Sequence, residues 1–121
     1  MKALIILAHG SRRNESNEEI KNLTIRIKAL IQKEFEVVDY AFLEAAKPSL
    51  TNLIENMVSN NVSEITIFPY FLNSGVHIKD DIPDIVEKSR IKYPKCKFKL
   101  TRPIGAYKKM PEIILKQLKS G

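Results

Sequence analysis

Short apolar runs alternate along the chain with longer segments in which apolar residues recur every three or four positions. The first run is almost continuously apolar, which is typical of a strand in a parallel sheet with both faces covered. Apolar runs of similar length indicate three more strands, and the four predicted strands are residues 2–8, 37–43, 64–72 and 97–102.

Helical spacing of apolar residues predicts one helix after each strand. Residues 16–19 have the pattern of a capping box, so the first helix is expected over residues 17–33. The third helix is expected to follow His77 and to end before Pro94. The apolar face of the last helix is indicated by Ile113, Ile114 and Leu118.

The predicted order of elements is βαβαβαβα. Strands that alternate with helices in this way lie parallel and are joined by right-handed crossovers, so we expect a three-layer α/β/α sandwich on a four-stranded parallel sheet. Residues 1–121 are expected to form this single domain. Ligands of such sheets bind beyond the carboxyl ends of the strands, where the strand-to-helix loops open.

The composition excludes several classes of protein. The chain is 44% hydrophobic with only 4 Gly and 6 Pro, unlike a disordered or collagen-like polymer. The apolar run at residues 3–8 is too short for a membrane span or a signal peptide, so we expect a cytoplasmic protein with no membrane partner. Cys96 is the single cysteine, which excludes an internal disulfide, and its alternating surroundings predict that it faces the core.

The net charge of +6 is concentrated in the last third of the chain. Residues 1–87 contain 9 Lys and Arg against 13 Asp and Glu, whereas residues 88–121 contain 11 against 1. This excess of positive charge favours an anionic partner, although a basic surface that contacts only solvent would have the same numbers of charged residues. A basic nucleic-acid-binding module is one alternative, but the segment has few aromatic residues and no recognised motif, so no nucleic-acid partner is expected.

The two histidines of the chain both fall near the ends of predicted strands. His9 follows the first strand, Glu44 the second and His77 the third, so their side chains are expected to meet at one edge of the sheet. Two imidazoles and a carboxylate suit a divalent metal such as Fe²⁺, Co²⁺, Ni²⁺ or Zn²⁺, and either histidine could accept a proton near neutral pH. A metal-dependent hydrolase or phospho-hydrolase on the same fold is an alternative that would use the same histidines.

The loop after the first strand also contains groups that bind anions. Ser11, Arg12 and Arg13 place a hydroxyl and two guanidinium groups at the start of the first helix, which suits a carboxylate or a phosphate. The alternative is that Arg12 and Arg13 are a solvated pair that binds no ligand. No G-x-G-x-x-G or Walker lysine loop occurs among the 4 glycines, so no glycine-rich motif supports nucleotide binding.

Three motifs give the chain a resemblance to one enzyme family. The motifs are LAHGSR (residues 7–12), FLxxGxHxxxDIP (71–83) and PIG (103–105). Together they resemble the small class II tetrapyrrole chelatases of the sirohydrochlorin chelatase family, over residues 3 to about 118. The resemblance implies insertion of Co²⁺ in the first place, or of Fe²⁺ or Ni²⁺, into sirohydrochlorin during cobalamin, siroheme or nickel-tetrapyrrole biosynthesis. It implies no cofactor beyond this metal substrate.

The resemblance also implies roles for individual residues. His9 and His77 handle the metal and the pyrrole protons, and Glu44 matches an acidic position of the family. Sirohydrochlorin has eight carboxylates, for which the expected contacts are Ser11, Arg12, Arg13 and Lys79. Larger members contain two such halves in one chain, so a homodimer with a shared cleft is the implied assembly. The histidine-rich segment of some members is absent from this sequence.

Overall fold

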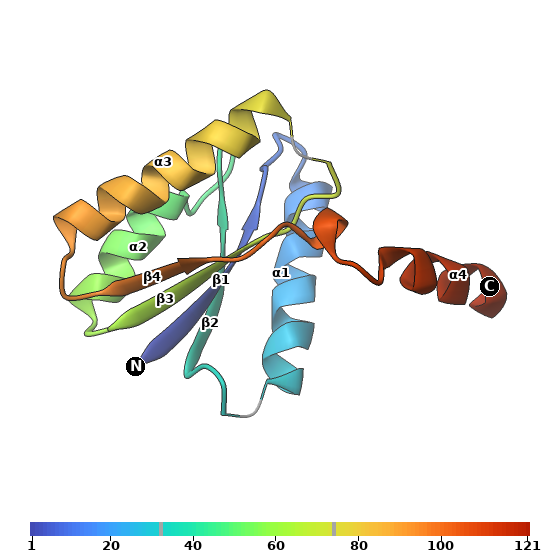
Figure 1. The fold of residues 1–121 in the computed structure, drawn as a ribbon, viewed down its shortest axis with the longest axis horizontal. Coiled ribbons are helices and arrows are strands. Elements are labelled where there is room, and N and C mark those ends of the chain that lie inside the picture. The colour runs from blue at the N-terminus through green and yellow to red at the C-terminus, as the bar shows by residue number, and fades with distance from the viewer. Residues whose placement is uncertain (32, 74) are drawn as a thin grey trace.

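Four parallel strands and four α-helices alternate along the chain (Figure 1). This computed structural model describes residues 1–31, 33–73 and 75–121, and for residues 76–78 it describes the backbone alone. The elements are β1 (Lys2–Ala8), α1 (Asn14–Leu30), β2 (Val37–Phe42), α2 (Leu50–Ser59), β3 (Glu64–Pro69), α3 (Val76–Lys92), β4 (Lys97–Leu100), the 3₁₀ helix η1 (Ile104–Ala106) and α4 (Met110–Ser120). The strand order is β2-β1-β3-β4, which confirms the predicted four-stranded parallel sheet.

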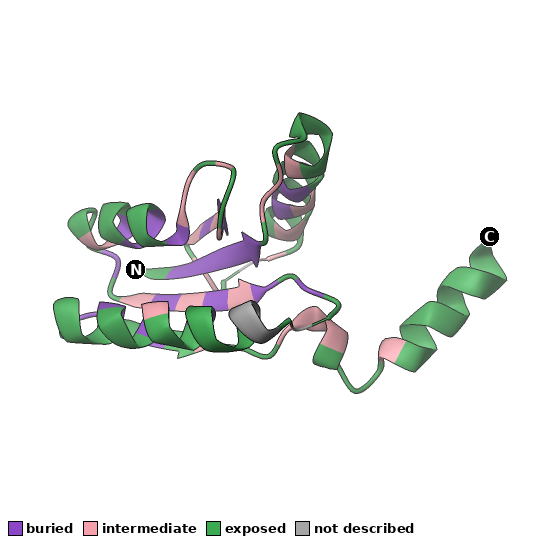
Figure 2. Ribbon diagram, turned by 90° about the horizontal axis from the view of Figure 1, so that it is seen from above, coloured by how far each residue is buried: buried purple, intermediate pink, exposed green. Residues whose placement is uncertain are grey.

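Helices cover both faces of this sheet. Because neighbouring residues of a strand point to opposite faces, Leu4 and Ile6 of β1 face α1, whereas Ile5 and Leu7 pack in the larger core beneath α2 and α3. The predicted three-layer arrangement is therefore confirmed. Helix α4 stands apart from these layers, beyond the carboxyl ends of the strands (Figures 1 and 2). Among the described residues, no helix combines the length and the apolar character that crossing a membrane requires.

The first helix begins earlier than the sequence pattern predicts. Residues 16–19 lie inside α1, whose N-cap is Arg13, so the predicted capping box is wrong. The side chain of Asn17 bonds to the backbone of Ser11 instead of capping a helix. The third helix also begins early, which places His77 in the first turn of α3 rather than in the preceding loop.

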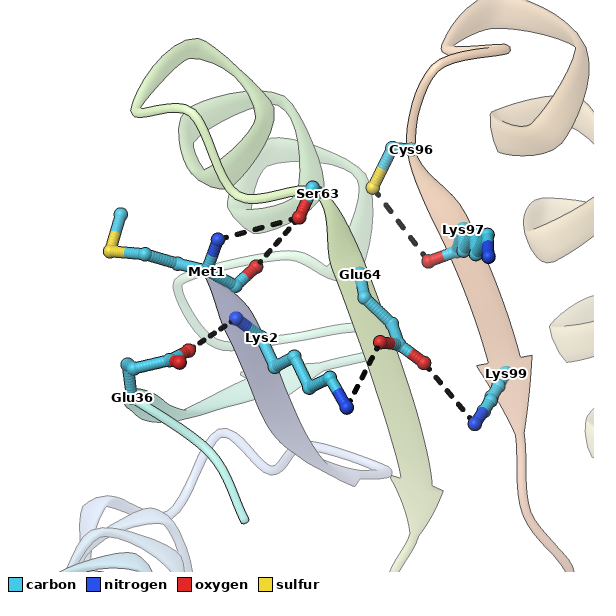
Figure 3. Close-up of polar contacts among 8 residues, drawn as sticks. All are labelled: Met1, Lys2, Glu36, Ser63, Glu64, Cys96, Lys97 and Lys99. Atoms are coloured by element: carbon cyan, nitrogen blue, oxygen red, sulfur yellow. Dashed lines mark hydrogen bonds and ion pairs between the residues drawn. The ribbon is translucent and has the colours of Figure 1, made fainter. Parts of the chain in front are cut away.

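A single carboxylate joins three strands near the amino end of the sheet. Oε2 of Glu64 lies 3.6 Å from Nζ of Lys2 on β1, and Oε1 lies 3.2 Å from Nζ of Lys99 on β4 (Figure 3). The hydrogen bond from Lys99 is the main cause that lowers the pKa of Glu64. Cys96 is buried nearby, as predicted, and burial raises the pKa of its thiol. These contacts stabilise the edge opposite to the strand-to-helix loops.

Candidate metal site

His9 and Glu44 meet at the carboxyl edge of the sheet although 35 positions separate them in the sequence. Nε2 of His9 lies 2.6 Å from Oε1 of Glu44. The strands β1 and β2 pair in register up to Ala8 and Phe42, so the residues that follow each strand emerge side by side. This pairing explains why the two side chains converge as the sequence predicts.

The backbone fixes the spacing between these two loops. The amide of Leu43 donates to the carbonyl of Ala8, and the amide of Glu44 donates to the carbonyl of His9, both at 3.0 Å. Gly10 has a φ of +97°, and a β-carbon at this position would lie 1.8 Å from the carbonyl oxygen of Glu44. Glycine therefore permits both the backbone conformation and the close approach.

Asn17 holds the loop that follows His9. Its Oδ1 accepts a hydrogen bond from the amide of Ser11 at 3.1 Å, and its Nδ2 donates to the carbonyl of Ser11 at 2.8 Å. The hydroxyl of Ser11 in turn accepts a hydrogen bond from the amide of Arg13 at 3.0 Å. Sequence reasoning missed this role because asparagine near a helix start is far more often a cap. Ser11 therefore acts here through its backbone and a local turn.

The His9–Glu44 pair is open to solvent. The side chain of His9 is 53% exposed and that of Glu44 is 66% exposed. The ring of Phe71 packs edge-on against the imidazole of His9, with ring centroids 6.4 Å apart and planes at 80°. This contact limits the orientations of His9 from one side and leaves the pair accessible to a large planar ligand. No group of three or more His, Cys, Asp or Glu side chains with metal-binding geometry occurs in the part of the chain that the structure describes.

His77 is placed by its backbone at the same edge. It lies in the first turn of α3, directly after the loop that follows β3. Strand β3 is the other neighbour of β1, and their register runs to the pair Leu7 and Pro69. The side chain of His77 lies outside the described residues, so its expected convergence with His9 and Glu44 stays a prediction.

Three of the four predicted anion-binding residues, Ser11, Arg12 and Lys79, line two separate cavities. Arg12 lines a cavity of about 240 Å³ between the loops after β1 and β2, together with Lys21 and Lys47. Lys79 lines a second cavity of about 270 Å³ between α3 and the end of β4. Arg13 is exposed at the N-cap of α1. Lys47 is a further candidate that sequence reasoning missed, because it becomes a neighbour of Arg12 only when β1 and β2 pair.

The basic last third of the chain is divided among several surfaces. Lys88, Arg90 and Lys99 form ion pairs with Asp84, Glu87 and Glu64. Other lysines lie on α4, far from the amino end of β4 (Figure 1). A continuous basic stripe of the kind that binds nucleic acid is therefore not formed by these residues.

Comparisons with known proteins point to one family. A family model described as CbiX matches residues 3–121. A sirohydrochlorin cobaltochelatase of Sulfurisphaera tokodaii is 30% identical over 114 residues, which cover 94% of this chain and 88% of the relative. A protein of the same name from Saccharolobus solfataricus is 26% identical over 98% of this chain and 94% of its own length.

Two solved structures have the same fold. A CbiX protein from Marinobacter aquaeolei VT8 superposes with a TM-score of 0.83 and 26% identity, over 99% of this chain and 96% of the other. The sirohydrochlorin chelatase SirB from Bacillus subtilis, in complex with cobalt, superposes with a TM-score of 0.83 and 24% identity. The match covers 98% of this chain but 50% of SirB, so the present chain spans about half of that protein.

Proposed function

This chain belongs to the CbiX family, and from that premise we propose that it inserts a divalent metal, Co²⁺ before Fe²⁺ or Ni²⁺, into sirohydrochlorin. The observation that best supports the proposal is the contact between His9 and Glu44 at the open carboxyl edge. The reaction exchanges two pyrrole protons for one M²⁺ and changes no oxidation state. The protein must therefore bind the metal weakly, accept protons and position the macrocycle.

His9 and Glu44 form a two-donor site for the incoming metal. Donor atoms on an octahedral ion at about 2.1 Å lie roughly 3.0 Å apart, so Nε2 and Oε1 need to separate by only a few tenths of an ångström from their 2.6 Å contact. Two protein donors leave several coordination positions for water and then for pyrrole nitrogens. Such a site can pass its metal to the macrocycle.

The same pair can remove the pyrrole protons. As the metal passes to the macrocycle, Nε2 of His9 becomes free to accept a pyrrole proton, and the carboxylate of Glu44 stabilises the resulting positive charge through its contact with Nε2. Both side chains are more than half exposed, so the proton can pass to solvent. We assign His77 as the third group of the site, because α3 begins at this edge of the sheet.

Cationic side chains near this edge suit the carboxylates of the macrocycle. Arg12 and Lys47 line one cavity, where Lys21 is already paired with Glu18, and Lys79 lines another, on the two sides of the strand pair β1 and β3. A planar substrate centred over His9 would extend toward both cavities. Charge contacts of this kind orient and retain a polyanion without taking part in the metal exchange.

A second copy of the chain is the proposed partner. The chain spans about half of SirB, so two copies with their carboxyl edges facing each other would supply an equivalent pair of halves. A single domain, a cytoplasmic location and the lack of any further cofactor stay predictions from the sequence.

An anaerobic metallation assay tests the proposed function. The spectrum of sirohydrochlorin is followed with Co²⁺, Fe²⁺ or Ni²⁺, with and without the protein, and we expect acceleration that is greatest with Co²⁺. A hydrolysis assay with a chromogenic phosphate ester serves as the comparison, and no turnover is expected there. Metallation no faster than the uncatalysed reaction for every metal would show that the proposal is wrong.

A further inference from the structure

The PIG motif at residues 103–105 has no part in the proposed metal chemistry. It follows β4 and leads into η1, and none of its three side chains can bind a metal or accept a proton. The motif nevertheless lies at the carboxyl edge of the sheet, where the loops after β1 and β2 place His9 and Glu44. A loop without donor groups can affect this site only through the residues that it contacts.

Gly105 joins this loop to the loop that follows β3 (Figure 1). Its amide donates a hydrogen bond to the carbonyl of Phe71 at 2.9 Å. A β-carbon at Gly105 would lie 1.9 Å from the carbonyl oxygen of Leu72 and 2.8 Å from its α-carbon. A larger residue would have to push one of the two loops away, so glycine permits their direct backbone contact.

Phe71 is the anchored residue of the loop after β3. Its side chain is 8% exposed and belongs to the main core cluster, whereas its neighbours Tyr70 and Leu72 are 42% and 70% exposed. The amide of Tyr70 donates to the carbonyl of Leu7 at 2.7 Å, which continues the pairing of β1 and β3 by one residue beyond the end of β3. Phe71 therefore emerges beside the residue that follows β1, which is His9.

The rings of Phe71 and His9 form an edge-to-face pair. Their centroids are 6.4 Å apart and their planes meet at 80°, a favourable geometry for two aromatic rings. The hydrogen bond between Nε2 of His9 and Oε1 of Glu44 must open before both atoms can bind one metal ion. The packing of Phe71 on His9 does not depend on that hydrogen bond, so it can hold the imidazole in place while the metal enters and leaves.

We propose that Phe71 is a positioning residue for His9 and that the PIG loop holds Phe71 in place through Gly105. The inference rests on the metal site proposed above and adds the residues that maintain its geometry. Phe71 acts through His9 and supplies no donor atom. Because a single aromatic contact is a small interaction, its loss should weaken metal binding by only about 2- to 10-fold.

A cobalt titration tests the role of Phe71. Phe71→Leu keeps an apolar side chain in the core and removes the ring, so we expect the Kd for Co²⁺ to rise by about 2- to 10-fold. Phe68→Leu is the matched control, because Phe68 is a half-buried phenylalanine of β3 that packs on the α1 side of the sheet. The control should unfold at a lower urea concentration with no change in Kd. Equal Kd values for wild type and Phe71→Leu, or equal increases in Phe71→Leu and Phe68→Leu, would overturn the inference.

A double substitution tests the link through Gly105. Gly105→Ala should displace the loop after β3 and weaken Co²⁺ binding, while Gly121→Ala at the end of the chain should bind as wild type. Once the loop has moved, the ring of Phe71 no longer contacts His9, so adding Phe71→Leu to Gly105→Ala should raise the Kd no further. Two effects that multiply would show that Gly105 does not act through Phe71.

Proton NMR of the metal-free protein gives a readout that needs no catalysis. The chain has two histidines, so comparison with His9→Ala identifies the imidazole signals of His9. We expect a nuclear Overhauser effect between the rings of Phe71 and His9 that is retained in Phe68→Leu and lost in Gly105→Ala. Its absence from wild type would overturn the inference and leave the chelatase proposal standing. If the effect and the order of Kd values are as expected but wild type does not accelerate metallation, the chelatase proposal alone would be wrong.

Discussion

The carbonyl oxygen of Glu44 lies where a β-carbon of residue 10 would be, only 1.8 Å from that position. Glycine at this point lets the loops after β1 and β2 touch, and their contact sets the distance between the His9 and Glu44 side chains. A similar approach occurs between the loops after β3 and β4, where a β-carbon at Gly105 would lie 1.9 Å from the carbonyl oxygen of Leu72. The strand-to-helix loops are thus joined in pairs by glycines.

Gly10→Ala should separate the His9 and Glu44 loops. The positive φ and the clash with Glu44 together should cost about 2 kcal/mol or more of the free energy of unfolding. Metal binding should weaken as well, because the donor atoms move apart. Urea unfolding and a cobalt titration measure the two effects.

Gly75→Ala is the control for that substitution. Its φ is −74° and a β-carbon there meets no atom within 4 Å, so only the poorer N-cap preference of alanine remains, which should cost less than about 1 kcal/mol. Equal losses of stability for Gly10→Ala and Gly75→Ala would contradict the role given to the loop contact.

Asn17→Ala should loosen the loop after His9. The substitution removes two hydrogen bonds to the backbone of Ser11, which are worth about 1–2 kcal/mol together. We expect slower metallation at every metal concentration, because His9 is less well positioned. Asn22→Ala, an exposed asparagine of the same helix, should behave as wild type. Identical metallation rates for the two variants would show that Asn17 does not position the site.

Arg12→Ala and Arg13→Ala should raise KM for sirohydrochlorin with a smaller change in kcat. Docking charges act before the chemical step, so their effect should diminish as salt shortens the Debye length below about 10 Å. Steady-state kinetics at two ionic strengths measure this. Arg26→Ala, in the middle of α1, is the matched control. An unchanged KM at low salt would mean that Arg12 and Arg13 are a solvated pair.

Glu64 should make stability depend on pH on the acid side. Its pKa is lowered in the folded state, chiefly by Lys99, so the ionised form stabilises the fold above the ordinary carboxylate range. This contribution should disappear as the pH falls through the lowered pKa. Urea unfolding of wild type and Glu64→Gln should therefore differ most at neutral pH and least in strong acid.

The sequence pattern predicts the sheet better than it predicts the ends of the helices. Strand β1 is a long apolar run whose burial leaves few alternatives, and its predicted bounds match the structure. The start of α1 is predicted too late. The helix begins at Asn14, and Asn17 is already inside it, bonded to Ser11 by a contact that exists only once the loop has folded. The pattern of residue types along the chain does not reveal contacts that form only when a loop folds.

The sequence predicts only part of the candidate site, because the other part also depends on how the loops fold. The meeting of His9 and Glu44 follows from parallel strands that end at one edge, so residue order is sufficient to predict it. Arg12 and Lys47 line the same cavity because of the way the loops after β1 and β2 bend, and residue order does not predict this bend. The apolar face of α4 was also evident from the sequence, but its position away from the sheet was not. Helical periodicity identifies an apolar face and does not show where that face lies in the fold.

The initial rate of cobalt insertion by His9→Ala and Glu44→Gln is the most direct test of the account. Each substitution should lower the rate by at least about 100-fold once the uncatalysed reaction is subtracted, because each removes a metal donor and a proton acceptor. Both side chains are exposed, so thermal unfolding and circular dichroism should match wild type. Glu55→Gln should retain the full rate. Near wild-type rates in correctly folded His9→Ala and Glu44→Gln would contradict the assignment of the His9–Glu44 pair as the site of metal insertion.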